Sequence, residues 1–127
     1  MKWLLSVHWV FISALWYFGN GILHDIFVLL KHKGKYDQEL LYLLLNGHIL
    51  ILSGIIVFVC YLMMLNKIQC GGLISIIIAV CMLIYCAMIF PFLKSLGTIV
   101  ISIILIIVSI KAMNSFPNIY EIMQKFK

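Results

Sequence analysis

Apolar residues fill four long stretches of the chain, and none of them alternates with polar residues as a half-buried β-strand does. Long apolar runs of this kind predict helices, because in a bilayer every backbone hydrogen bond must be made within the segment. We expect membrane-spanning helices over residues 3–30, 40–65, 73–92 and 96–113. About 20 residues cross the hydrocarbon core, so the first segment should tilt or project from the bilayer.

Polar residues, glycine and proline separate the apolar stretches. Lys31 to Glu39 is the most polar part of the chain and predicts the first loop, and Asn66 to Gly72 predicts a short second one. Pro91 marks the third break. In the tail, 114–127, Pro117 lies near an expected helix start, and five apolar residues fall roughly on one side: Ile119, Tyr120, Ile122, Met123 and Phe126. That spacing favours an interfacial amphipathic helix, and a frayed tail is the alternative.

Composition assigns the chain to a class. Hydrophobic residues make up 65% of the 127 residues and charged residues 10%, with a mean hydropathy of +1.20, far from soluble globular proteins. We therefore predict an all-α integral membrane protein, a single four-transmembrane-helix bundle with a short C-terminal interfacial tail. We expect no cleaved signal peptide, because the first apolar run is too long and too aromatic.

The net charge of +5 comes from nine lysines at segment ends, with no arginine. Lysine there is the expected boundary charge, and no basic face predicts nucleic acid binding. Four spans place both termini on the same side of the membrane. Five lysines lie on that side and four on the opposite one, which favours cytoplasmic termini. An arginine-free, isoleucine-rich chain is typical of an AT-rich genome, whether bacterial or organellar. We expect the bacterial inner membrane, with an organellar membrane as the alternative.

The four cysteines have neither Cys-x-x-Cys nor zinc-ligand spacing. Cys81 and Cys86 would lie about 140° apart around a helix, which disfavours a disulfide between them. We interpret the cysteines as small apolar packing residues.

Small and polar residues share helix faces. In the first segment Ser6, Ser13 and Asn20 recur every seven residues, and His24 lies about 40° from Asn20. The other segments carry similar faces, formed by Gly47 and Gly54 in the second, by Thr98, Ser102 and Ser109 in the fourth and, less markedly, by Gly72, Ser75 and Ala79 in the third. Small residues let membrane helices approach closely, so these faces should pack together in a bundle.

Five polar residues are expected to lie in one half of the bilayer: Asn20, His24, Asp25, Asn46 and His48. His24 and His48 are predicted at matching depth, about 9 and 12 Å from the same membrane face. Asp25 lies about 100° from His24, at the edge of its face. Asn46 and His48 are about 160° apart, so they cannot both point at the first segment unless the helix is distorted near Gly47.

Three roles fit this polar cluster. Interhelical hydrogen bonding is the structural one. An imidazole beside a carboxylate also fits a proton relay, because ionisable residues inside a membrane are expensive and their default reading is functional. Two histidines at equal depth, with Gly21 and Gly47 alongside, meet the minimum geometry for bis-histidine haem b. A di-metal site is disfavoured, since Asp25 is the only acidic residue in the spans.

The size, the four spans and the polar cluster near one end resemble the layout of small bacterial four-helix membrane proteins such as the DoxX-like group, and no residue role follows from that layout. No motif for nucleophilic catalysis occurs. We predict an accessory or stabilising subunit of a larger membrane complex, without catalysis of its own and with other membrane subunits and lipid as partners. The alternative is a small redox or proton-handling protein that uses His24, Asp25 and His48. If its role is redox, His24 and His48 would bind haem b.

Overall fold

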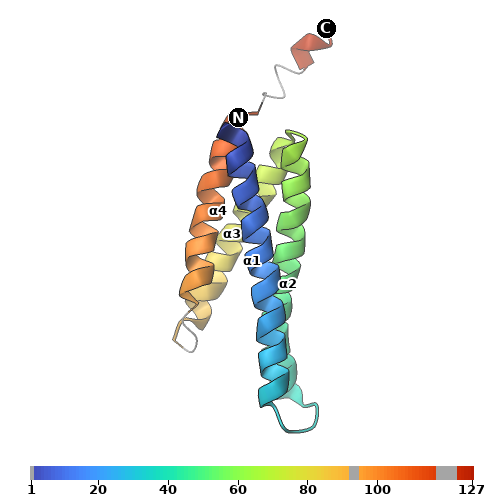
Figure 1. Cartoon of the computed structure of the whole chain (residues 1–127), viewed down its shortest axis with the longest axis vertical. Helices are drawn as coiled ribbons and strands as arrows, with labels where there is room; N and C mark the ends of the chain where they lie inside the picture. Colours follow the sequence, from blue (N-terminus) through green and yellow to red (C-terminus); the bar gives the residue numbers. More distant parts are fainter. Residues whose placement is uncertain (1, 92–94, 117–122) are drawn as a thin grey trace.

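The computed structural model of the chain is a bundle of four helices: α1 (Lys2–Lys31), α2 (Gln38–Leu65), α3 (Gln69–Ile89) and α4 (Leu96–Asn114) (Figure 1). It describes residues 2–91, 95–116 and 123–127. The chain is 86% helical, with no strand in these ranges, and all four helices are long and apolar enough to cross a membrane. The prediction of an all-helical chain with four such helices is confirmed.

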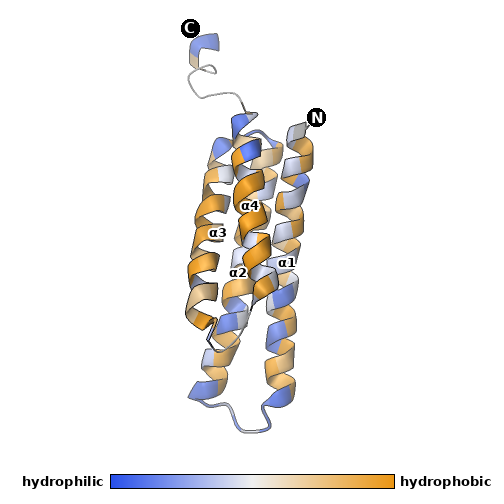
Figure 2. Ribbon diagram, turned by 90° about the vertical axis from the view of Figure 1, so that its left-hand side faces the viewer, coloured by the Kyte–Doolittle hydropathy of each residue, from blue (hydrophilic) through white to orange (hydrophobic). Residues whose placement is uncertain are grey.

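The helices run alternately up and down, and each packs mainly against its neighbours in the sequence. α1 also packs against α4, which closes the ring, whereas diagonal contacts are sparse (Figures 1 and 2). Short connections between long helices lead to this antiparallel arrangement. In Figure 2, α3 and α4 are almost continuously hydrophobic, but hydrophilic positions interrupt the lower halves of α1 and α2.

The four helices end together at one end of the bundle but not at the other. At the end that carries the N-terminus, the Trp3 ring lies 6.0 Å from the ring of Phe116, and the Lys67 ammonium lies 5.4 Å from the Trp3 ring. α1 and α2 contain 30 and 28 residues, against 21 and 19 in α3 and α4. The lower ends of α1 and α2 therefore extend beyond α3 and α4 as a two-helix hairpin (Figure 1).

Local hydrogen bonds explain where α2 begins and ends. The Asp37 carboxylate accepts a hydrogen bond of 2.8 Å from the Leu40 backbone N–H, so this N-cap starts the helix at Gln38, two residues before the predicted start. At the other end Lys67 adopts φ 58°, and the N–H groups of Lys67 and Ile68 donate to Met64 and Met63. This Schellman motif turns the chain within three residues.

Gly71 and Gly72 lie inside α3, so the prediction that they close the second loop is wrong. Both are buried in the first turns of the helix. A Cβ on Gly71 would approach the Cys60 carbonyl oxygen to 2.8 Å, and one on Gly72 would overlap Met113. Glycine is required here for close packing of α3 on α2 and α4 rather than for a turn.

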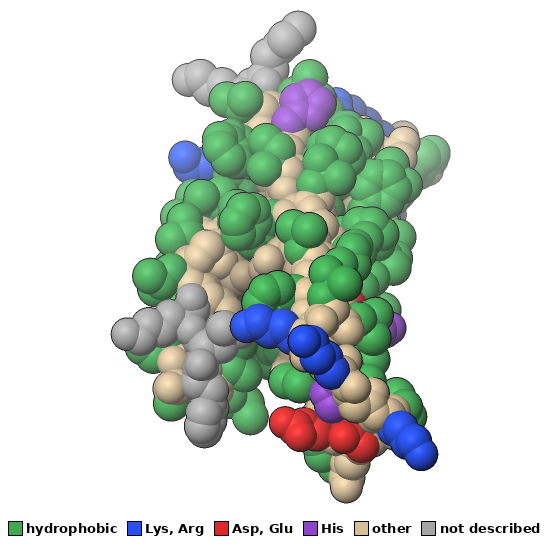
Figure 3. All heavy atoms as spheres, turned by 60° about the horizontal axis from the view of Figure 1, so that its bottom comes forward, with side chains coloured by type: hydrophobic (Ala, Val, Ile, Leu, Met, Phe, Trp, Pro, Cys, Tyr) green, Lys and Arg blue, Asp and Glu red, His purple; other side chains and the backbone are tan. Residues whose placement is uncertain are grey.

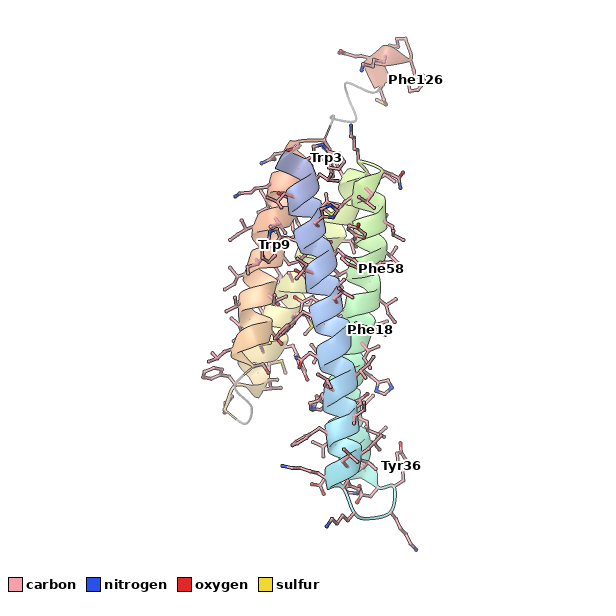
Figure 4. The ribbon with its side chains drawn as sticks, viewed as in Figure 1. Trp3, Trp9, Phe18, Tyr36, Phe58 and Phe126 are labelled. Atoms are coloured by element: carbon pink, nitrogen blue, oxygen red, sulfur yellow. The ribbon has the colours of Figure 1, made fainter. Side chains whose placement is uncertain are left out.

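The core is narrow and made of small and medium-sized residues. On α1, Val7, Ala14, Gly21 and Val28 are buried at seven-residue intervals, which is the spacing of a coiled-coil seam. The outer surface is covered by exposed leucine, isoleucine and phenylalanine side chains on all four helices, including Phe18 and Phe58 (Figure 4). Of the four cysteines, all free, Cys60 and Cys86 are buried as packing residues, but Cys70 and Cys81 are exposed.

The predicted amphipathic tail falls mostly outside the described residues, since Pro117, Ile119, Tyr120 and Ile122 belong to residues 117–122. In the part that is described, Met123 and Phe126 are both exposed. The Asn114 end of α4 leads into a backbone turn in which Ser115 and Phe116 N–H groups donate to Ala112 and Met113. The proposed interfacial helix stays a prediction.

Candidate functional site

Two glycines bring α1 and α2 into backbone contact at the level of the polar cluster. A Cβ on Gly21 would lie 2.6 Å from the Gly47 carbonyl oxygen and 2.8 Å from the Ile51 nitrogen. A Cβ on Gly47 would lie 2.9 Å from the Gly21 carbonyl oxygen and would overlap the Asp25 carboxylate. The missing side chain of Gly47 is therefore the space in which the Asp25 carboxylate lies.

Asp25 crosses this contact and pairs with His48. One carboxylate oxygen, Oδ2, lies 2.9 Å from His48 Nδ1, and only 13% of the Asp25 side chain is exposed. His48 Nδ1 also lies 2.9 Å from the Leu44 carbonyl oxygen. Both neighbours of Nδ1 are acceptors, so this nitrogen carries a proton, which is directed at the Leu44 carbonyl oxygen with the Asp25 carboxylate paired beside it. The imidazole is thereby fixed on the outer side of the two helices, with 66% of its side chain exposed.

His24 approaches the same carboxylate from the other side. Its Nδ1 lies 3.7 Å from Asp25 Oδ1, which is too long for a hydrogen bond. Both atoms are buried, and neither has a hydrogen-bond partner among the described residues. A shift of less than 1 Å would join them, because neutral His24 can place its proton on Nδ1. The Asp25 carboxylate thus has one oxygen satisfied by His48 and the other within reach of His24.

The predicted five-residue cluster is divided between two sides of the α1 and α2 pair. Asn20, His24 and Asn46 line a groove of about 1080 Å³ that faces the ends of α3 and α4, whereas His48 lies outside it. Asp25 lies between the helices. A regular α2 helix accounts for this, since side chains about 160° apart on it reach the two sides of α1. The distortion near Gly47 considered from sequence is not needed.

The two histidines do not face a common cavity, because only His24 lines the groove. Their Nδ1 atoms are both directed at Asp25. Within the described residues, no three His, Cys, Asp or Glu side chains are arranged to hold a metal ion. Haem b ligation by His24 and His48 stays a prediction, for which an absorption spectrum is the test.

Side-chain hydrogen bonds connect α1 to α4, one in the wall of the groove and one beyond it. The Asn20 amide donates to Thr98 Oγ1 at 3.3 Å, and the Tyr17 and Ser102 hydroxyls lie 2.6 Å apart. Ser102 also donates to the Thr98 carbonyl oxygen at 2.8 Å. Tyr17 is fully buried and was not among the predicted residues. Its spacing, three residues before Asn20 and four after Ser13, is the sequence signal that places it on the same face.

The other predicted packing residues lie at helix contacts, with one exception. Ser13 is buried and donates to the Trp9 carbonyl oxygen at 2.9 Å, and a Cβ on Gly54 would approach the Phe18 nitrogen to 2.6 Å. Ser109 is buried on α4, and its hydroxyl has no partner among the described residues. Ser6 is only half-buried.

Comparison of the chain with protein-family models, with curated protein sequences and with solved structures gave no significant match. The layout that it shares with small bacterial four-helix proteins therefore assigns no family.

Proposed function

We propose that the chain is an integral membrane protein whose four helices all cross the bilayer, as the accessory or stabilising subunit of a larger membrane complex. Helix length supports the insertion. The 21 residues of α3 and the 19 of α4 rise about 31 and 28 Å, close to the roughly 30 Å of a hydrocarbon core. Their outer surfaces expose isoleucine, leucine and valine, which lipid chains can cover.

The hairpin formed by α1 and α2 is longer than the thickness of this hydrocarbon core. The Asn20 to Thr98 hydrogen bond fixes the register of α1 against α4. With these two residues level and a rise of about 1.5 Å per residue, His24 lies about 3 Å beyond Leu96, the first residue of α4, along the bundle axis. Leu30 lies about 12 Å beyond it. In this placement the polar cluster lies at the membrane boundary instead of within the hydrocarbon, and residues 26–45, which we call the hairpin end, project into the headgroup region.

The observation that carries the subunit proposal is the apolar surface of the hairpin end. Outside the groove it exposes Leu30 by 76%, together with Ile26, Leu29, Leu41, Tyr42 and Leu45. Single exposed leucines are normal in water, but six large exposed apolar side chains on two adjacent helix ends outside the hydrocarbon favour a protein contact. The proposed partner is a membrane protein that covers this patch at the bilayer surface, and the proposed role is structural rather than catalytic.

Photocrosslinking in native membranes tests this proposal. A photoreactive amino acid at Leu30 or Leu45 should give a crosslink of one discrete mass to a second kind of protein. The matched controls are Ile77 and Ile84, which are similarly exposed on α3 and should label lipid. Equal, protein-free patterns at all four positions would overturn the proposal, and so would a product containing only a second copy of this chain.

A second candidate is proton handling, favoured by one observation. Asp25 stands between two imidazoles, with His48 paired to one oxygen and His24 3.7 Å from the other, so a proton has acceptors on both sides of the helix pair. In vesicles with an internal pH dye, the protein should accelerate proton equilibration and Asp25→Asn should abolish the effect. Wild-type vesicles that equilibrate no faster than empty ones would contradict this candidate.

A further inference from the structure

The groove lies where α1 and α2 pass the ends of α3 and α4. Its volume of about 1080 Å³ is just above the range for small-molecule sites, about 300 to 1,000 Å³. Apolar walls are supplied by all four helices: Phe27, Leu43, Leu50, Ile89 and Leu96 are among the lining residues. Figure 3 brings this end of the molecule forward and shows charged side chains and a histidine gathered near the end of the hairpin, below a mainly hydrophobic surface.

The groove is positively charged. Among the described residues that line it, Lys31 has the only formal charge and none is a carboxylate. The Lys31 ammonium lies 4.5 Å from the centre of the Phe27 ring, a cation–π contact that draws it back along α1 to the rim of the groove. A ligand with an anionic group would find its counter-charge there.

Deeper in the groove lie two polar side chains without protein partners. Neither the Asn46 amide nor the His24 imidazole makes a hydrogen bond to another residue in the described part of the chain, although both line the groove. The nearby Asn20 amide differs, because it already donates to Thr98. Polar groups in an apolar site are expected to have partners, so Asn46 and His24 are free to bind acceptor atoms of a ligand.

These groups follow one order along the groove. The Lys31 ammonium lies beside Phe27, His24 lies about one helical turn further along α1, and the apolar residues Trp16, Leu50 and Tyr85 lie beyond them. A cation, then hydrogen-bonding groups, then apolar walls is the complement of a molecule with an anionic head, neutral oxygen acceptors and a hydrocarbon tail.

We propose that the groove binds one phospholipid with an anionic headgroup. Its phosphate lies against Lys31. Its ester carbonyl oxygens accept hydrogen bonds from the Asn46 amide and from His24 Nε2, which carries the imidazole proton in the lipid-bound state because Nδ1 is buried beside Asp25. An acyl chain runs between Leu50 and Leu96. The site is at the bilayer boundary, where headgroups are located, and basic pockets between membrane helices are suited to anionic lipids. This inference rests on the membrane insertion proposed above, but not on the partner subunit.

Lipid competition in nanodiscs, read out by mass spectrometry of the intact complex, tests the headgroup. The wild type should prefer phosphatidylglycerol over phosphatidylcholine of identical chains about fivefold, the effect of one lysine near an anionic surface. Lys31→Ala should remove that preference and Lys31→Arg should keep it. Lys111→Ala, at an exposed lysine near the other end of the bundle, should leave it unchanged.

A second measurement tests the carbonyl contacts. Ether-linked phosphatidylglycerol lacks the ester carbonyls and should bind the wild type several-fold more weakly than the ester lipid. In Asn46→Leu, the difference in affinity between the ester-linked and the ether-linked lipid should be smaller than in the wild type. Inorganic phosphate should not displace the lipid, because it cannot fill the apolar walls.

Equal binding of the two headgroups by the wild type, or an equal loss in Lys31→Ala and Lys111→Ala, would overturn the lipid site. Displacement by inorganic phosphate alone would also overturn it, since the site would then be an anion site. Failure of the protein to enter nanodiscs would overturn membrane insertion, which is a different result from insertion with unselective binding.

Discussion

Asp25 on α1 reaches His48 on α2 through the space left by the missing side chain of Gly47, and the carboxylate and imidazole meet at 2.9 Å. Glycine at this position performs two tasks, because it lets the helix backbones touch at Gly21 and it leaves room for a charged group between them. The polar cluster and the tight helix contact are therefore one feature of the bundle.

Gly47→Ala should destabilise the protein by about 1 to 3 kcal/mol, because the new Cβ would overlap the Asp25 carboxylate and approach the Gly21 backbone. Gly19→Ala is the matched control. A Cβ there meets nothing within 4 Å, so the better helix propensity of alanine should stabilise α1 by about 0.5 to 1 kcal/mol. Thermal unfolding in the same detergent measures both, and equal stability of the two variants would refute the close contact.

A double-mutant cycle between Asp25 and His48 should give a coupling free energy of about 1 kcal/mol. The value is modest because two-thirds of the His48 side chain is exposed, which screens the pair. The cycle between Asp25 and His24 should give about half as much or less, since their closest atoms are 3.7 Å apart. Unfolding of the alanine variants measures the coupling, and a larger value for His24 would mean that it is the main partner of Asp25.

Tyr17→Phe should cost about 0.5 to 1.5 kcal/mol of stability. The substitution removes the 2.6 Å hydrogen bond to Ser102, but the Ser102 hydroxyl keeps its bond to the Thr98 carbonyl oxygen, so no buried group loses its last partner. Tyr36→Phe, at a side chain 69% exposed on the first loop (Figure 4), should change stability by less than about 0.5 kcal/mol. Indistinguishable unfolding temperatures would show that the buried hydroxyl contributes nothing.

Both chain termini should face the cytoplasm, because four crossings return the chain to its starting side and five lysines lie there against four on the other. Reporter domains fused in turn to the N-terminus and C-terminus should report the same compartment, and a reporter inserted at Gly34 in the first loop should report the opposite one. Termini found in different compartments would contradict four crossings. If both termini were found on the outer side, the predicted orientation would be wrong but the four crossings would stand.

Hydrophobic length was sufficient to predict the helices, and helical spacing placed Thr98, Ser102 and Ser109 on one face. Two features of the helices required tertiary information. The glycines at 71 and 72 looked like turn residues, but Lys67 makes the turn and the glycines pack. Spacing places Tyr17 on the face of Ser13 and Asn20, but its complete burial and its contact with Ser102 depend on how α1 packs against α4.

The groove could not be predicted, because it depends on how the unequal helices are aligned. Sequence indicated that the first two apolar segments are longer than the others, but not which end of the bundle holds the excess. The contact of Trp3 with Phe116 fixes the flush end, and the groove follows at the other, beside the polar residues. The same alignment places His24 and Asp25 near the start of α4, which in the proposed membrane placement is the bilayer boundary.

The central claim is that α3 and α4 match the hydrocarbon thickness while the hairpin end projects from it, and spin-label depth measurement in nanodiscs tests this most directly. Labels at Ile77 on α3 and Ile103 on α4, both exposed near the helix centres, should be accessible to oxygen and protected from a water-soluble nickel complex. A label at Leu30 should show the reverse, because it lies about 12 Å beyond the start of α4. A label at Leu30 as deep as the one at Ile77 would contradict the claim, since lipid would then cover the hairpin end without a partner.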